Sequence, residues 1–219
     1  MEQTDIWSIN PSTSATFFKT VGTVTGGVFP RALTLTNTNP VVAKEGAGYR
    51  LVFTSAGNDT GITFTINGAV VGDLNPQGAS SVNFPEVVTG GNAGAVNSTY
   101  YYSRIDSITI SAAAAGTVSV GTTGGLALPR CRIKGFYILG HATAGSLKID
   151  RHTWTTTDGT PSLVTPGLAE NVLDISTPAG ATITQFLSLP GQGVLTGQQQ
   201  NDFSVVTETN ITDYTLFCG

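Results

Sequence analysis

The stretch ITFTING, residues 62–68, alternates apolar and polar side chains up to its closing glycine. A period of two places Ile62, Phe64 and Ile66 on one face of a strand and the threonines on the other. The stretch YRLVFT, residues 49–54, precedes it across SAGNDTG, residues 55–61, whose Gly, Asn and Asp suit a tight turn. We therefore expect the two strands to form a β-hairpin.

Similar short strands recur along the whole chain at intervals of about ten residues, and no segment offers a long amphipathic helix. Residues 132–138 and 146–151, joined by GHATAG at 140–145, are expected to form a second hairpin. Further strands are expected at residues 32–36, 103–111, 117–121, 171–175, 182–187, 203–207 and 214–217. This pattern predicts an all-β fold of antiparallel β-sandwiches, Ig-like or jelly-roll-like.

The stretch TTGGLALP, residues 122–129, joins two glycines to a proline where one series of strands ends. Such punctuation is typical of a domain boundary. We expect an N-terminal arm over residues 1–20, a β-sandwich domain over 21–128 and a smaller C-terminal β domain over 129–219.

Charged side chains are scarce, at 11% of the 219 residues, against roughly 25% in an ordinary soluble domain. So thinly charged a surface indicates that much of it faces other protein. The formal charge of −4 and the ten scattered basic residues argue against nucleic-acid binding. No unbroken apolar run suggests a membrane span, and the acidic N-terminus does not match a secretory signal, so we expect a soluble protein made in a cytoplasm.

Few residues here could carry catalysis or hold a metal. The two imidazoles are His141, in an expected turn, and His152, which alternation places on one face with Asp150 and Trp154. We interpret His141 as solvated, and His152 as part of a polar cluster on an edge strand or as a pH-sensitive contact. No nucleophile elbow, facing carboxylate pair or phosphate-binding glycine loop is present.

Two further features have a plain structural interpretation. The turn at Asn58 and Asp59 lacks the regular spacing of a calcium loop. Cys131 and Cys218 lie far apart in sequence, and we expect both to be reduced and structural. The sequence therefore predicts a protein that is not an enzyme and has no catalytic residues, cofactor or metal.

Aromatic side chains are the best candidates for contacts with a partner. Tyr100, Tyr101 and Tyr102 form the one dense cluster, with Tyr101 pointing opposite to its neighbours in a strand, and we favour a protein interface over a sugar platform. Trp7, Phe17 and Phe18 lie in the N-terminal segment, which either packs on its own domain or docks on a neighbouring subunit.

The first half of the sequence resembles a β-sandwich type of protein found in the virions of tailed bacteriophages. The resemblance covers about residues 21–125 and rests on SAGNDTGITFTI (55–66), GGNAG (90–94) and IDSITISAAAAGTVSVG (105–121). LDISTPAGAT (173–182) and TLFCG (215–219) are similar to the ends of small phage head or tail accessory proteins. The resemblance implies a structural role in the virion, with no catalytic or cofactor residues to carry over.

We accordingly expect a capsid decoration, or cement, protein that is made in the host cytoplasm and located in the virion. Its partners would be the major capsid protein and copies of itself, in a homo-oligomer such as a trimer. A tail, baseplate or fibre-anchoring component is the alternative within the same class. From a different class, a receptor- or glycan-binding module would use the rings of Tyr100 to Tyr102.

Overall fold

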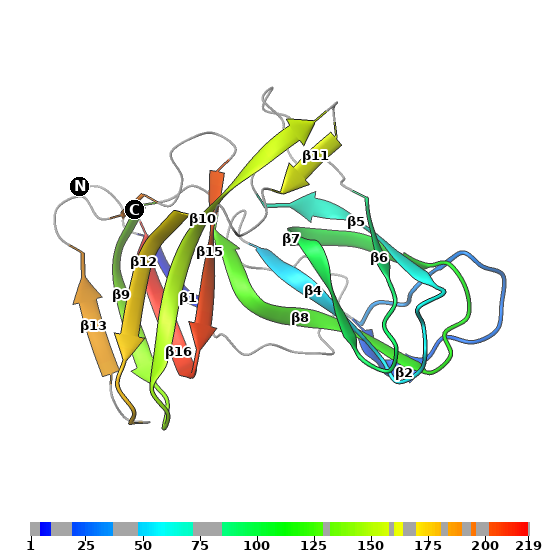
Figure 1. Ribbon diagram of the computed structural model, residues 1–219, viewed down its shortest axis with the longest axis horizontal. Coiled ribbons are helices and arrows are strands. Elements are labelled where there is room, and N and C mark those ends of the chain that lie inside the picture. Colours follow the sequence, from blue (N-terminus) through cyan, green and yellow to red (C-terminus); the bar gives the residue numbers. More distant parts are fainter. Residues whose placement is uncertain are drawn as a thin grey trace.

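The computed structural model describes residues 5–9, 19–36, 48–71, 85–128, 132–157, 160–163, 170–180, 184–189, 194–195 and 202–218. Within these ranges the chain forms sixteen strands and no helix, and the paired strands are antiparallel. The prediction of an all-β chain with antiparallel sheets is confirmed. Figure 1 shows the strands in two groups along the long axis, with both termini in the same group.

The strands belong to two sheets. The five-stranded sheet contains β1 (Asp5–Ile9), β16 (Ile211–Cys218), β9 (Arg132–Gly140), β13 (Thr184–Ser188) and β14 (Val194–Leu195), the last two both paired with β9. The eleven-stranded sheet runs in the order β11 (Thr160–Leu163), β10 (Gly145–Thr157), β15 (Asp202–Thr209), β8 (Thr117–Leu128), β4 (Gly48–Ser55), β7 (Ala95–Ile110), β5 (Thr63–Val70) and β6 (Glu86–Thr89). In addition, β12 (Glu170–Thr177) pairs with β10, β2 (Lys19–Thr23) with β8 and β3 (Arg31–Ala32) with β7.

Strand β7 bends between two groups of partners. Its residues 95–102 pair with β4, and its residues 102–110 pair with β5, with irregularities in register along both ladders. Bulges of this kind bend a strand and increase its twist. Inward side chains of β7 and of the strands around it form the first core. This core consists of Val24, Leu33, Leu51, Phe53, Ile62, Phe64, Ile66, Val88, Tyr102, Ile105, Ile108, Ile110, Ala114, Val118 and Val120.

The expected hairpin of residues 49–68 is wrong. Strands β4 and β5 do not pair with each other, because both pair with β7 over different parts of its length. Their inward side chains meet instead across the first core, where the rings of Phe53 and Phe64 stack with centroids 4.8 Å apart. The alternation of Ile62, Phe64 and Ile66 was interpreted correctly, since all three are buried.

The second core lies between the five-stranded sheet and the C-terminal strands of the larger sheet. It consists of Leu126, Leu128, Ile133, Phe136, Ile138, Leu147, Ile149, Val206, Ile211, Tyr214 and Leu216. The expected hairpin of residues 132–151 is also wrong, because β9 and β10 belong to different sheets. The turn at 140–145 carries the chain over this core from one sheet to the other, as Figure 1 shows for the green and yellow-green strands.

Strand β8 belongs to both groups of strands. Residues 118–122 pair with β4 and residues 126–128 with β15, while Gly48 and Tyr49 of β4 pair with Ala127 and Leu126. Between these stretches Arg50 alone lies opposite residues 123–125. The segment expected to mark a domain boundary is therefore strand over residues 122–128, and the division of the chain at residue 128 stays a prediction.

The N-terminal segment contributes a strand to each group. Residues 5–9 pair with β16 in the five-stranded sheet, and Lys19, Gly22 and Thr23 pair with β8. For residues 5–9 the structure therefore favours the interpretation in which the segment packs on its own chain.

The two groups of strands are called the first half and the second half. The first half comprises β2 to β7 with residues 117–122, and the second half comprises residues 126–128 with β1 and β9 to β16.

A small junction cluster lies across the two halves. It consists of Val71, Tyr101, Ala127, Phe203 and Val205. These side chains occupy the face of the large sheet opposite to the two cores, since their neighbours Tyr102, Leu126 and Val206 point into the cores. The halves are thus joined on both faces, by the partly buried Tyr49 that contacts both cores and by the junction cluster.

Gly48 offers a test of how tightly the junction is packed. A Cβ atom there would lie 2.5 Å from the backbone carbonyl of Tyr102 and 2.6 Å from Cγ2 of Val71. We expect Gly48→Ala to lower the free energy of unfolding by about 1–3 kcal/mol in urea titrations, because the well-packed junction must shift to admit the methyl group.

Gly61→Ala is the matched control, because a Cβ atom at Gly61 meets nothing within 4 Å. Its expected effect is within about 0.5 kcal/mol. Equal stability of the two variants would contradict the close approach of β4 to β7.

Candidate functional site

The tyrosine triplet lies mostly inside the protein. Tyr102 is fully buried in the first core, and Tyr101 is 7% exposed in the junction cluster, so the two rings point to opposite faces as alternation predicts. Tyr100 is partly exposed. Of the three rings expected at a contact surface, those of Tyr101 and Tyr102 pack inside this chain, and that of Tyr100 is partly buried against the same clusters.

A bulge in β7 lies next to the triplet. Leu51 of β4 lies opposite residues 98–100, and its N–H donates to Oγ of Ser98 at 2.8 Å. That hydroxyl donates in turn to the carbonyl of Tyr100 at 2.9 Å. The side chain of Ser98 thus replaces the backbone acceptor that the bulge removes from the ladder.

Glu86 of β6 satisfies the other side of the bulge. Its carboxylate is 8% exposed and accepts hydrogen bonds from the N–H groups of Thr99 and Tyr100, the latter at 3.3 Å, and from the hydroxyl of Tyr102 at 3.0 Å. Burial, and then the charge of Glu86, raise the pKa of Tyr102 far above its ordinary value. This buried carboxylate therefore fixes the shape of β7, a role that sequence reasoning missed because its partners lie more than ten residues away.

Asp59 has a similar structural role. It is 1% exposed, accepts a hydrogen bond from the N–H of Ala115 at 2.7 Å on Oδ1, and accepts another from the hydroxyl of Ser55 on Oδ2. Both carboxylate oxygens therefore tie neighbouring loops together. Among the described residues no group of three or more His, Cys, Asp and Glu side chains is placed to share a metal ion.

The two histidines lie in different surroundings. His141 is exposed, and its Nδ1 accepts a hydrogen bond from the N–H of Thr143 at 3.1 Å. His152 is 7% exposed and stacks on Phe203 with ring centroids 5.5 Å apart. The strand register confirms that Asp150 and His152 share a face, opposite Val205 and Phe203 of β15.

Several predicted residues lie outside the described part of the structure. Phe17, Phe18 and Cys131 fall there entirely, and so do the side chains of Trp7 and Cys218, although Trp7 pairs with Leu216 through its backbone. Their contacts with partners therefore stay predictions. Within the described ranges, no helix is long and apolar enough to cross a membrane.

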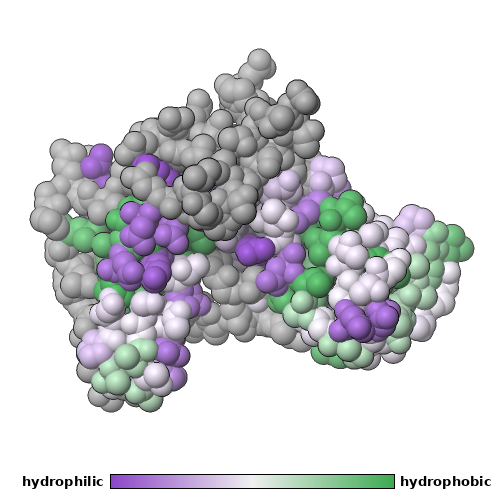
Figure 2. All heavy atoms as spheres, in the orientation of Figure 1, coloured by the Kyte–Doolittle hydropathy of each residue, from purple (hydrophilic) through white to green (hydrophobic). Residues whose placement is uncertain are grey.

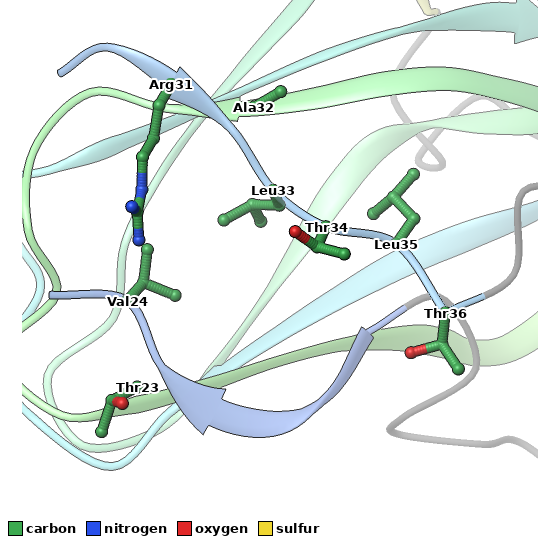
Figure 3. A pocket seen from close by; sticks show the side chains of 8 residues that line it. All are labelled: Thr23, Val24, Arg31, Ala32, Leu33, Thr34, Leu35 and Thr36. Atoms are coloured by element: carbon green, nitrogen blue, oxygen red, sulfur yellow. The ribbon is translucent and has the colours of Figure 1, made fainter. Parts of the chain in front are cut away.

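A groove of about 340 Å³ opens at one edge of the first half. Figure 3 shows β2 on one side and the segment 31–36 on the other. Leu35 is partly buried there, whereas Val24 and Leu33 are almost fully buried as members of the first core. Three threonines add hydroxyl groups, and Arg31 is the one charged residue among those that line the groove. The Arg31 guanidinium lies 5.2 Å from the centroid of the Phe29 ring.

The groove is flanked by strand edges. Strand β2 pairs with β8 and β3 pairs with β7, and no other described strand pairs with either of them. The connection between β2 and β3 lies at the end of the molecule away from the termini (Figure 1), where apolar surface is visible in Figure 2. Val28, in this connection, is 88% exposed and Val21 of β2 is 62% exposed. Open edges beside apolar surface are suited to binding an extended peptide segment.

Comparison of the chain with protein family models, curated proteins and solved structures finds no match. The candidate site therefore rests on the geometry of the chain alone, and the groove between β2 and residues 31–36 is taken as that site.

Glu86 provides a test of the internal role assigned to buried carboxylates. We expect Glu86→Gln to lower the free energy of unfolding by about 1.5–3 kcal/mol, because the amide leaves buried donors of β7 without a charged acceptor. The measurement is equilibrium unfolding in urea.

Asp106→Asn is the control, because Asp106 is an exposed carboxylate of β7 whose side chain is 36% accessible and pairs with Arg104 at 2.8 Å. Its loss is expected to cost less than about 1 kcal/mol. If Glu86→Gln were as mild as this control, the carboxylate would not be holding the bulge.

Proposed function

We propose that the chain is a structural protein of a tailed-phage virion, and specifically a capsid decoration protein built from two antiparallel β-sandwich domains. It binds the outer face of the shell and stabilises it through contacts with the major capsid protein and with copies of itself. Support comes from the sequence resemblance, from the scarcity of charge at 11% of residues, and from a groove suited to a strand of another subunit.

The groove between β2 and residues 31–36 is the observation that carries this proposal. An extended segment lying there gains backbone hydrogen bonds from either flanking edge and apolar contact with the partly buried Leu35. Arg31 favours a segment with an acidic side chain at that end. Such recognition uses backbone and shape, which suits a protein with few charged side chains.

Stabilisation of the shell would be additive. A specific interface buries on the order of 1,000 Å² or more, and many copies on one particle multiply modest individual affinities. The exposed side chains Val21, Val28, Val87 and Tyr137 add apolar surface available for such contacts. A homo-oligomer, such as a trimer, increases the number of contacts for each binding event.

A tail, baseplate or fibre-anchoring component would use the same kind of contact, and copy number distinguishes the two. Hundreds of copies in each particle support the shell, and a few to a few dozen support the tail. A glycan-binding module based on the tyrosine triplet loses support, because the rings of Tyr101 and Tyr102 are buried. Indifference of glycan or host adsorption to Tyr100→Ala would count further against that module.

The proposal predicts that the purified chain binds expanded capsids that lack it. Cosedimentation should show saturable binding, and Arg31→Glu should weaken it roughly ten- to hundredfold by opposing the acidic segment in the groove.

Lys148→Glu is the matched control, because Lys148 is an exposed cation of the second half, paired with Asp174 at 3.3 Å. Its binding should equal that of the wild type. Absence of binding by the wild type would overturn the function, whereas binding that Arg31→Glu leaves intact would overturn only the role of the groove.

A further inference from the structure

The imidazole of His152 lies against the junction cluster and has one hydrogen-bonding atom without a partner among the described residues. The side chain of His152 is only 7% exposed. Its Nδ1 atom has no hydrogen-bond partner in the part of the chain that the structure describes. The imidazole stacks on Phe203 at an interplanar angle of 18°. Phe203 in turn contacts Tyr101 of the first half, with ring centroids 5.9 Å apart. His152 therefore lies against the contact that joins the halves on this face.

We propose that the joint between the two halves is acid-sensitive, because protonation of His152 places a charged ring with an unsatisfied N–H beside the apolar contact between Tyr101 and Phe203. A buried charge without a hydrogen-bond acceptor is costly, and the cost is relieved when the site opens to water. Acid would therefore weaken the packing of β15 and β10 on β7. This inference goes beyond the proposed function and does not depend on it.

The charged and titratable groups on this face are few. Asp150, on the same strand, lies on the same face as His152. On the far side of the cluster, Arg50 of β4 lies 5.9 Å from the ring centroid of Tyr101. The remaining members, Val71, Ala127 and Val205, are apolar. Asp150 is therefore the group whose charge favours the imidazolium.

Burial outweighs the attraction of Asp150, and the pKa of His152 lies below its ordinary value. Because the folded chain prefers the neutral ring, its contribution to stability is complete above the unfolded pKa of about 6.5. It is lost as pH falls from there through the folded pKa. Acidification therefore weakens the contact between the two halves.

Glu208 acts in the opposite direction and must be separated from His152. It lies opposite Leu147 in the strand register, on the face of the second core, and burial raises its pKa. Its contribution to stability is present at low pH and is lost as pH rises through the folded pKa. The acid response of the wild type alone is thus a sum of two effects.

The test compares the full-length wild type with His152→Phe, whose ring preserves the stack and cannot take up a proton. Urea unfolding is measured at about pH 7.5 and pH 5. On acidification, the equilibrium constant for unfolding should rise more for the wild type than for the variant. The extra rise should be about tenfold for each unit by which folding lowers the pKa of His152. His141→Phe, at the exposed histidine, should respond as the wild type does, and Glu208→Gln should leave the His152-dependent difference in place.

Hydrogen exchange distinguishes the joint from the whole fold. After correction for the intrinsic pH dependence of exchange, amides of β15 and β10 should lose protection on acidification before those of β5 and β6 do, and His152→Phe should abolish the difference. The same acid response in wild type and His152→Phe would overturn the proposal. If His152→Phe does not fold, the NMR ring resonances of His152 are titrated in the His141→Phe background instead. A titration of His152 that leaves the amide resonances of Tyr101 and Phe203 unchanged overturns the proposal. A titration in which these amide resonances change together with the ring supports it.

Discussion

The hydrogen bonding of β8 to strands of both halves is the constraint on which the rest of the structure depends. Its residues 118–122 pair with β4, its residues 126 and 127 pair with both β4 and β15, and Leu128 pairs with β15. Where the register shifts, Arg50 lies opposite three residues of β8, including Gly124 and Gly125. A bulge at glycines lets the strand turn between the halves without leaving the sheet. The two cores are therefore connected by backbone hydrogen bonds.

Two of the few charged side chains in this chain are buried and hold irregular backbone in place. Glu86 holds the bulge of β7, and Asp59 ties the loop after β4 to the loop before β8. Both carboxylates are more than nine-tenths buried and accept hydrogen bonds from backbone N–H groups. Irregular strands need such acceptors because their N–H groups have left the ladder. The surface is left with little charge, which is consistent with binding through backbone edges and apolar side chains.

Local sequence patterns predicted the strands well and their pairing poorly. The alternation of Ile62, Phe64 and Ile66 identifies an inward face, and the structure buries all three residues. The turn chemistry of residues 55–61 is the same whether the chain forms a hairpin or passes over a core, so it could not reveal that Phe53 stacks on Phe64. Likewise, Gly124 and Gly125 have the same signature in a linker as in a bulge.

The candidate site was harder to predict for a related reason. The side chains of residues 100–102 do alternate between the two faces of the sheet. The junction cluster covers the face that a single core would leave exposed, so Tyr101 is buried as well as Tyr102. The groove is formed by β2 and residues 31–36, whose separate pairing with β8 and β7 brings them together only in the folded chain. Its aliphatic and threonine side chains have no distinctive spacing in the sequence.

Because β8 is hydrogen-bonded to strands of both halves, we expect the two halves to unfold as one cooperative unit. Scanning calorimetry near neutral pH tests it most directly. We expect a single reversible transition whose calorimetric and van 't Hoff enthalpies agree. Two separable transitions, with the first half melting independently of the second, would contradict it.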